Sequence, residues 1–158
     1  MPTGEILLPP GAGYDITTSA ALWKVFDGTN ADTDHLEYPS GTILQKFWTF
    51  EIPNDYSSAP AFLLQWRSTA TAGQVLWDIG LAGVGSGSST DPILGTTTGT
   101  STAVGTARNL STVTITATAT LATSQYAIAR IIRQGTHGSD GMTGTAELVM
   151  VIFKYTTT

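Results

Sequence analysis

The sequence predicts an all-β protein, folded as an antiparallel two-sheet sandwich of the jelly-roll type with about eight strands. Three observations indicate this fold class. Several segments alternate apolar and polar residues with a period of two, as half-buried strands do. Turns rich in glycine separate these segments, and no segment carries a helical apolar stripe of useful length. An immunoglobulin-like sandwich is the alternative arrangement of the same strands.

The length predicts one domain with an extension at its start. A chain of 158 residues buries enough surface to fold without a metal or a disulfide, and this one contains no cysteine. We assign residues 1–20 to an extended N-terminal arm and residues 21–158 to the sandwich domain.

The arm contains the residues that we single out as candidates for interaction. Two consecutive prolines fix the backbone and remove two donors, which favours an extended arm over a helix or a central strand. Its apolar side chains need cover, either from a neighbouring subunit or from the sandwich itself. On the first alternative, deletion of residues 1–20 leaves the sandwich folded and weakens assembly. The candidate interaction residues are Ile6, Leu7, Leu8, Pro9, Pro10 and Tyr14.

The first half of the domain contains four strand candidates. Residues 21–26 predict a short strand that ends in a turn at 27–30, and residues 31–41 predict a polar loop. Residues 43–52, 61–67 and 74–81 predict three further strands, rich in the aromatic and aliphatic residues that suit a pleated surface.

In the second half of the domain, the strand pattern is clearest in residues 111–155. Residues 83–105 are small and flexible in composition, with one short strand near 96–102. Residues 111–120 alternate apolar residues with threonine, which predicts a half-buried strand. Residues 125–133 predict another, and the nearly continuous apolar run at 145–155 predicts a closing strand covered on both faces.

Charge and hydropathy exclude two classes of partner. Seven scattered basic residues against twelve acidic ones give a net charge of −5, so no nucleic-acid surface is expected. No apolar run approaches the roughly 18 residues that span a bilayer, so no membrane contact is expected. No secretory leader opens the chain, which predicts a cytoplasmic product. Charged residues make up only 12%, which indicates a surface partly covered by neighbours or simply a threonine-rich β protein.

No motif predicts catalysis, a cofactor or a metal. Gly83 to Gly87 lacks the following helix that a phosphate site requires. The acidic segment 27–37 does not fit the helix–loop–helix calcium pattern, although an irregular calcium loop stays possible. Asp55, Asp78 and Glu147 are candidates for a carboxylate pair, but solvated or ion-paired carboxylates are favoured. We therefore predict no enzyme, no catalytic residue, no cofactor and no metal.

The aromatic residues allow a sugar-binding platform as a further possibility. Trp48, Trp66, Trp77 and Tyr56 could stack against sugar rings. Each lies in a strand or at its end, among apolar neighbours, so core packing is the favoured interpretation.

One set of strand patterns resembles a known family. It consists of Phe47–Phe50, Pro53–Tyr56, Leu63–Trp66, Gly73–Ile79, Gln125–Arg133, Asp140 and Ala146–Tyr155. Together they resemble jelly-roll virion proteins of tailed bacteriophages, of the type found among head decoration (cement) proteins, over roughly residues 42–155.

The resemblance implies a function and a set of partners. It implies a non-enzymatic homotrimer that binds the major capsid protein and stabilises the head lattice. The protein would be made in the host cytoplasm and reside on the capsid surface of the virion. The alternatives are a tail, fibre or baseplate component with a receptor- or carbohydrate-binding sandwich, and a free carbohydrate-binding module or enzyme.

Overall fold

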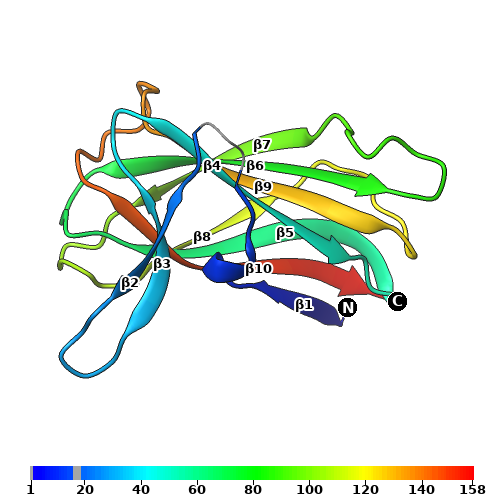
Figure 1. The fold of residues 1–158 in the computed structure, drawn as a ribbon, viewed down its shortest axis with the longest axis horizontal. Coiled ribbons are helices and arrows are strands. Elements are labelled where there is room, and N and C mark those ends of the chain that lie inside the picture. Colours follow the sequence, from blue (N-terminus) through cyan, green and yellow to red (C-terminus); the bar gives the residue numbers. More distant parts are fainter. Residues whose placement is uncertain (1, 16–18) are drawn as a thin grey trace.

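A computed structural model describes residues 2–15 and 19–158, and within them ten strands form two facing antiparallel sheets (Figure 1). The six-stranded sheet contains β1 (Thr3–Leu8), β2 (Leu22–Phe26), β3 (Thr33–Tyr38), β5 (Tyr56–Arg67), β8 (Ser111–Thr116) and β10 (Ala146–Thr157). The four-stranded sheet contains β4 (Ile43–Glu51), β6 (Gln74–Val84), β7 (Gly95–Thr102) and β9 (Tyr126–Gln134). A single 3-10 turn, η1 (Pro10–Ala12), follows β1.

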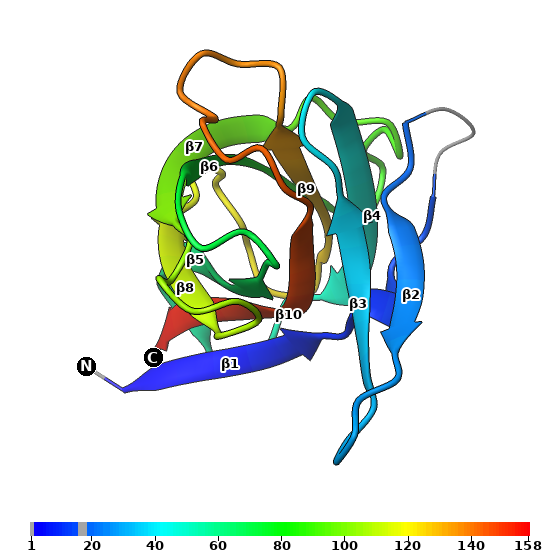
Figure 2. The ribbon, with the colours of Figure 1, turned by 90° about the vertical axis from the view of Figure 1, so that its left-hand side faces the viewer.

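The order of pairing is that of a rolled-up hairpin. Strand β3 pairs with β10, β4 with β9, β5 with β8 and β6 with β7. Pairing of β10 with β5 and of β9 with β6 then joins these ribbons into two sheets (Figure 2). This nesting is the jelly roll, so the predicted two-sheet sandwich is confirmed. Eight strands build the roll, and β1 and β2 are additional.

One of the ten strands lies where the sequence predicted a polar loop. Residues 33–38 form β3 and pair with β2 on one side and β10 on the other. Leu36 and Tyr38 alternate into the core and have no exposed surface. The prediction of a loop at 31–41 was therefore wrong, because two inward side chains suffice to fix a strand whose outward positions are polar.

The N-terminal segment is part of the sandwich. Strand β1 pairs with β10 from Thr3 opposite Thr156 to Leu8 opposite Val151. The chain then crosses to the other sheet, where Tyr14 bridges Phe47 at the edge of β4 (Figure 2). We call residues 2–15 the strap, because they connect the two sheets across their open side.

Two side-chain contacts hold the strap in place. The indole Nε1 of Trp48 donates to the carbonyl oxygen of Pro9 at 3.0 Å. Lys46 Nζ lies 2.7 Å from Asp15 Oδ1, and the lysine side chain is buried. The strap therefore satisfies two polar groups of β4 that would otherwise be buried without a partner.

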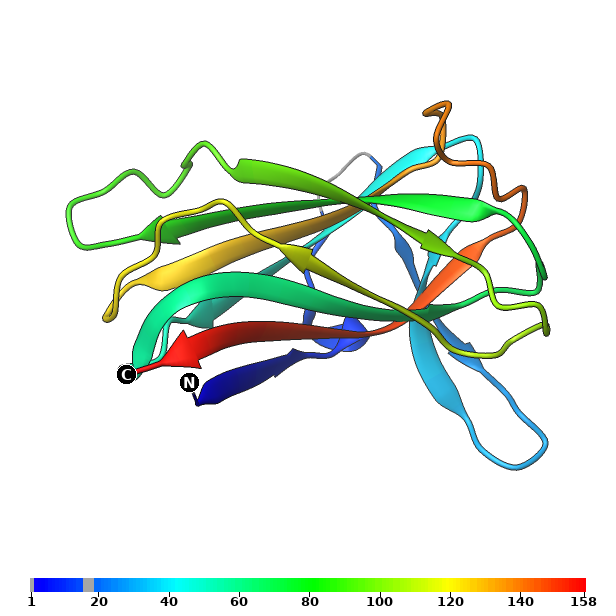
Figure 3. The same ribbon diagram turned by 180° about the vertical axis from the view of Figure 1, so that it is seen from behind.

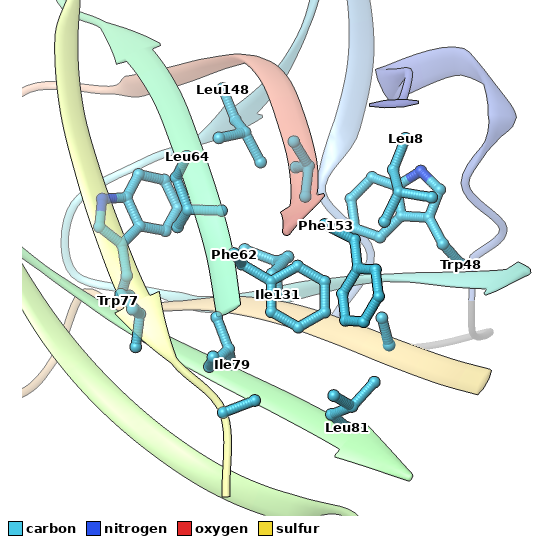
Figure 4. Packing of buried hydrophobic residues seen from close by; sticks show 14 of the residues in the cluster. Leu8, Trp48, Phe62, Leu64, Trp77, Ile79, Leu81, Ile131, Leu148 and Phe153 are labelled. Carbon is cyan, nitrogen blue, oxygen red and sulfur yellow. The ribbon is translucent and has the colours of Figure 1, made fainter. Parts of the chain in front are cut away.

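The core lies between the sheets and contains three of the four tryptophans, Trp48, Trp66 and Trp77, the first and last of which are labelled in Figure 4. Trp77 packs edge-on against Tyr38 and Trp66, with ring centroids 5.4 and 6.1 Å apart. Buried Trp66 donates from its indole nitrogen to Ser101 Oγ at 3.0 Å, which satisfies its polar group.

Strand β10 is covered on one face only, contrary to the prediction for residues 145–155. Val151, Phe153 and Tyr155 point into the core, whereas Ile152 and Lys154 between them are partly exposed. A bulge between Leu148 and Met150 interrupts the alternation. The apolar run in the sequence therefore resembled that of a strand buried on both faces, although its outward side chains are partly exposed.

Candidate interaction surfaces

The six predicted interaction residues do not form one surface. Leu8 and Pro10 are buried in the chain's own sandwich, and Ile6 packs against the core. Leu7, Pro9 and Tyr14 are exposed. Half of the predicted residues therefore pack against the protein's own core and are not available to a partner. The apolar residues of the strap point alternately inward and outward.

A larger exposed apolar surface lies on the hairpin formed by β2 and β3. The hairpin projects beyond the body of the sandwich (Figures 1 and 3). Among the described strands, β2 pairs with β3 alone, so its outer edge is unpaired. Leu22, Trp23 and Val25 each expose more than half of their surface. Because successive residues of a strand point to opposite faces, Trp23 and Val25 lie on one face of β2 and Leu22 lies on the other, next to Lys24.

The loop end of the hairpin is held against the body by charge. Phe26, the last residue of β2, lies under two guanidinium groups, with Arg67 Cζ 4.7 Å and Arg108 Cζ 4.3 Å from its ring centroid. Both arginines also pair with Glu147, at 2.7 and 3.2 Å. A stacked cation attracts the aromatic face, so the loop end of β2 is held against the body.

The acidic residues of this region do not assemble a metal site. Asp32 Oδ1 accepts a hydrogen bond from the backbone nitrogen of Gly28, and Asp34 Oδ2 accepts one from the indole of Trp23. Nowhere in residues 2–15 and 19–158 do three or more His, Cys, Asp or Glu side chains gather as a metal would require. The irregular calcium loop considered for residues 27–37 has no support in this geometry.

A groove of about 540 Å³ crosses the outer face of the four-stranded sheet. Its floor follows one row of the sheet, since Phe47, Arg130, Gly80 and Thr96 lie opposite one another on β4, β9, β6 and β7. Tyr14 extends this row beyond β4 and stacks on Phe47, with ring centroids 5.7 Å apart and planes inclined by 25°.

The segment between β6 and β7 forms the other wall of the groove. Leu94 lies over Gly80, where a Cβ atom would approach the Leu94 side chain within 3.0 Å. The absence of a side chain at Gly80 therefore lets this segment lean onto the sheet. Ile93, which precedes Leu94 in this segment, is 97% exposed at the rim of the groove.

The three candidate carboxylates lie in different parts of the sandwich and have different partners. Glu147 faces outward from the six-stranded sheet, whereas Asp78 faces outward from the four-stranded one. Asp55 precedes β5 and accepts a hydrogen bond from the Tyr155 hydroxyl. Burial, together with this hydrogen bond, raises the pKa of Tyr155. Carboxylates on opposite faces of the sandwich cannot flank one glycosidic bond.

The four aromatic residues considered for a sugar platform lie in the core. Trp48, Trp66, Trp77 and Tyr56 are all buried, as the favoured interpretation held. The most exposed aromatic residues of the described chain are Tyr14, which the sequence analysis named as an interaction candidate, and Trp23, which it did not. The segment at Gly85–Ser86–Gly87 leads into β7 rather than a helix.

Within the described residues, no helix is of a length and hydropathy that would let it cross a membrane.

Comparison with known proteins gives no family. No family model matches the chain, and no curated protein matches it. One similar solved structure is an arabinose-bound α-L-arabinofuranosidase, MgGH51, with a TM-score of 0.48 and 16% identity over 90% of this chain and 23% of that one. Another is the enzymatically active domain of tailspike protein 4 of bacteriophage CBA120, with a TM-score of 0.39 and 12% identity over 95% of this chain and 19% of that one. The chain spans less than a quarter of either protein, and likenesses this distant say nothing about its activity.

Proposed function

We propose that the chain is a non-enzymatic structural subunit of a bacteriophage virion, a head decoration protein that forms a homotrimer through its β2–β3 hairpin. The observation that carries this proposal is the hairpin itself, which exposes Leu22, Trp23 and Val25, is unpaired at the outer edge of β2 and is held to the body at its loop end. A contiguous exposed apolar surface of this kind is typical of a protein–protein interface.

Burial of the exposed apolar side chains of the hairpin would contribute several kcal/mol to association. Complete burial of a valine or leucine side chain contributes about 1.5–3 kcal/mol. Leu22, Trp23 and Val25 are each more than half exposed in the single chain, so cover from a neighbour buries substantial apolar area. Paired addition of a strand at the free edge of β2 would also satisfy its backbone groups.

Charge favours a closed ring over a twofold dimer. Antiparallel pairing of β2 with itself about its centre would place Lys24 opposite Lys24, and like charges directly opposite each other destabilise a sheet. In a ring, the hairpin of one copy packs on a different surface of the next, so the lysines do not meet. Exposed Ile43, Val104 and Leu110 offer apolar partners on the body.

The same features fit attachment to the head. A trimer presents three identical faces, and several weak contacts with the major capsid protein add up through multivalency. The proposed location is therefore the capsid surface of the virion. A tail, fibre or baseplate component that binds a receptor is the second candidate, and the groove on the four-stranded sheet is the observation that favours it.

Mass measurement and binding to heads test this proposal. We expect a trimer by light scattering, and co-sedimentation with empty heads of the phage that carries the gene. The double variant Trp23→Ser/Val25→Ser should be a monomer that circular dichroism shows to be folded, because both side chains are more than half exposed in the single chain. The matched control Ile93→Ser, on the other sheet, should remain a trimer.

Two results would contradict it. A wild-type protein that is monomeric and ignores heads would eliminate the decoration role, and a trimer that survives both hairpin substitutions would show that the hairpin is not the interface of the trimer. Binding to isolated tails and not to heads would replace the leading candidate with the second one.

A further inference from the structure

We infer that the groove across β4, β9, β6 and β7 is a binding site for a neutral saccharide. This inference is independent of the proposed assembly role, because the groove and the hairpin lie on different sheets. Its volume of about 540 Å³ falls within the range of ligand sites, which is roughly 300–1,000 Å³.

The backbone beneath the groove leaves recognition to side chains. Strands β9 and β6 are interior strands, each paired on both sides, so their peptide groups are already hydrogen-bonded. An extended peptide binds a sheet by adding to a free edge, which this floor does not offer. A ligand in the groove must therefore be held by the side chains that line it.

Arg130 lines the groove, and its guanidinium faces Asp78, which lies on the same sheet outside the groove. Arg130 Nε is buried and has no hydrogen-bond partner among the described residues, and the same holds for Asp78 Oδ1. Arg130 Nη2 lies 3.8 Å from Asp78 Oδ1, which is too far for a hydrogen bond. An acceptor on a ligand would have to reach the terminal nitrogens of this guanidinium, because Nε has no accessible surface whereas the Arg130 side chain as a whole is 22% exposed.

The apolar walls complete a surface suited to a sugar ring. Tyr14 and Phe47 form a stacked aromatic pair at one end, and Ile93 stands almost fully exposed at the other. The C–H face of a pyranose packs on such surfaces, and its hydroxyl groups accept from a guanidinium and donate to a carboxylate. An apolar ligand would leave the Arg130 donors unpaired, which carries a cost.

The charge of the groove selects a neutral ligand. Asp91 and Arg130 are the charged residues that line the groove, so their charges balance, and Asp78 outside the groove faces the same guanidinium. The whole chain carries a net charge of −5. Anionic sugars, such as sialylated or sulfated ones, are therefore repelled.

A glycan array with neutral, sialylated and sulfated oligosaccharides tests the inference. Wild-type protein should bind members of the neutral class, and titration calorimetry with the best of these should then give an affinity in solution. Arg130→Gln should weaken that affinity at least tenfold, and Tyr14→Ala should weaken it several-fold. The control Lys154→Gln removes a cation from the other sheet and should bind like wild type.

The outcomes separate cleanly. No binding in the neutral class, binding confined to acidic glycans, or binding that survives both Arg130→Gln and Tyr14→Ala would overturn the site. Circular dichroism establishes that each variant is folded, and Tyr14→Ala keeps the test valid if Arg130→Gln unfolds. Because neither variant touches the hairpin, the trimer mass should be unchanged, so failure of this site and failure of the assembly role are distinguishable.

Discussion

The guanidinium of Arg133 and the carboxylate of Asp140 form an ion pair in which neither side chain has any exposed surface, with Nη2 2.6 Å from Oδ1. Arg133 also donates to the carbonyl oxygens of Tyr38, Gly144 and Met142. Asp140 Oδ2 accepts from the backbone nitrogen of Leu76 as well. The pair therefore ties the turn after β9 to β3 and β6.

Asp140→Ala should lower the free energy of unfolding by about 3–5 kcal/mol, because it leaves a charged guanidinium buried without its partner. Urea denaturation measures the change. The control Asp91→Ala removes an exposed carboxylate and should have little effect. The double variant Arg133→Met/Asp140→Leu should recover much of the loss, and a double variant as unstable as Asp140→Ala would contradict this explanation.

Removal of the strap should destabilise the sandwich, in contrast to the expectation from the sequence alone. Loss of the buried Leu8 side chain costs about 1.5–3 kcal/mol. The Trp48 indole, left without the Pro9 carbonyl, adds about 1–3 kcal/mol. Deletion of residues 1–14 should therefore lower the melting temperature markedly, as differential scanning calorimetry would show.

A point substitution in β1 tests the same contact without shortening the chain. Gly4 lies beneath the ring of Tyr155, and a Cβ atom at this position would collide with that ring. Gly4→Val should cost about 1–3 kcal/mol through overpacking. Glu5→Gln, one residue along, alters only an exposed ion pair and should be nearly neutral. Equal stability of the two variants would show that β1 does not pack as described.

The phenol of Tyr38 should make stability fall at alkaline pH. Burial raises the pKa of Tyr38 above the ordinary value of 10.0. Because the folded protein holds this proton more tightly than the unfolded chain does, the contribution is complete below pH 10 and is lost as the pH rises above it. Unfolding measured from pH 8 to 11 should show a smaller decline in Tyr38→Phe than in wild type, and an identical decline would count against this assignment.

Phe26→Ala should loosen the β2–β3 hairpin. Two guanidinium groups over the ring contribute about 0.5–1 kcal/mol each at sites of this exposure. Their loss should speed hydrogen exchange of the β2 amides several-fold while leaving β9 unchanged. Phe26→Leu keeps an apolar side chain without the aromatic face, so exchange as slow as in wild type would contradict a role for the stacked cations.

Strands with regular alternation could be predicted from the sequence, and those whose pattern mixes two environments could not. Residues 125–133 became β9, with Ala127, Ala129 and Ile131 buried as the alternation indicated. Strand β3 was missed because only Leu36 and Tyr38 mark its inward face among polar neighbours. Local pattern does not record which positions a distant strand will cover.

The candidate sites were harder to predict from the sequence than the strands were. The groove draws Tyr14, Phe47, Ile93 and Arg130 from four separate segments, and only pairing across the sheet brings them together. The sequence of the hairpin contained one indication of an exposed apolar surface, because Leu22, Trp23 and Val25 place apolar groups on both faces of a strand. Whether a layer lies opposite such a strand depends on the topology.

The place of β10 has a consequence for how the protein matures. This strand is the last of the ten to be synthesised, yet it lies between β5 on one side and β1 and β3 on the other. Until the ribosome has released it, the six-stranded sheet has a gap at its centre, and apolar strands such as β5 lack a partner. Folding therefore has to wait for nearly the whole chain, and the nascent protein passes through a state that is open to aggregation. Expression at low temperature or with chaperones should improve the soluble yield for this reason.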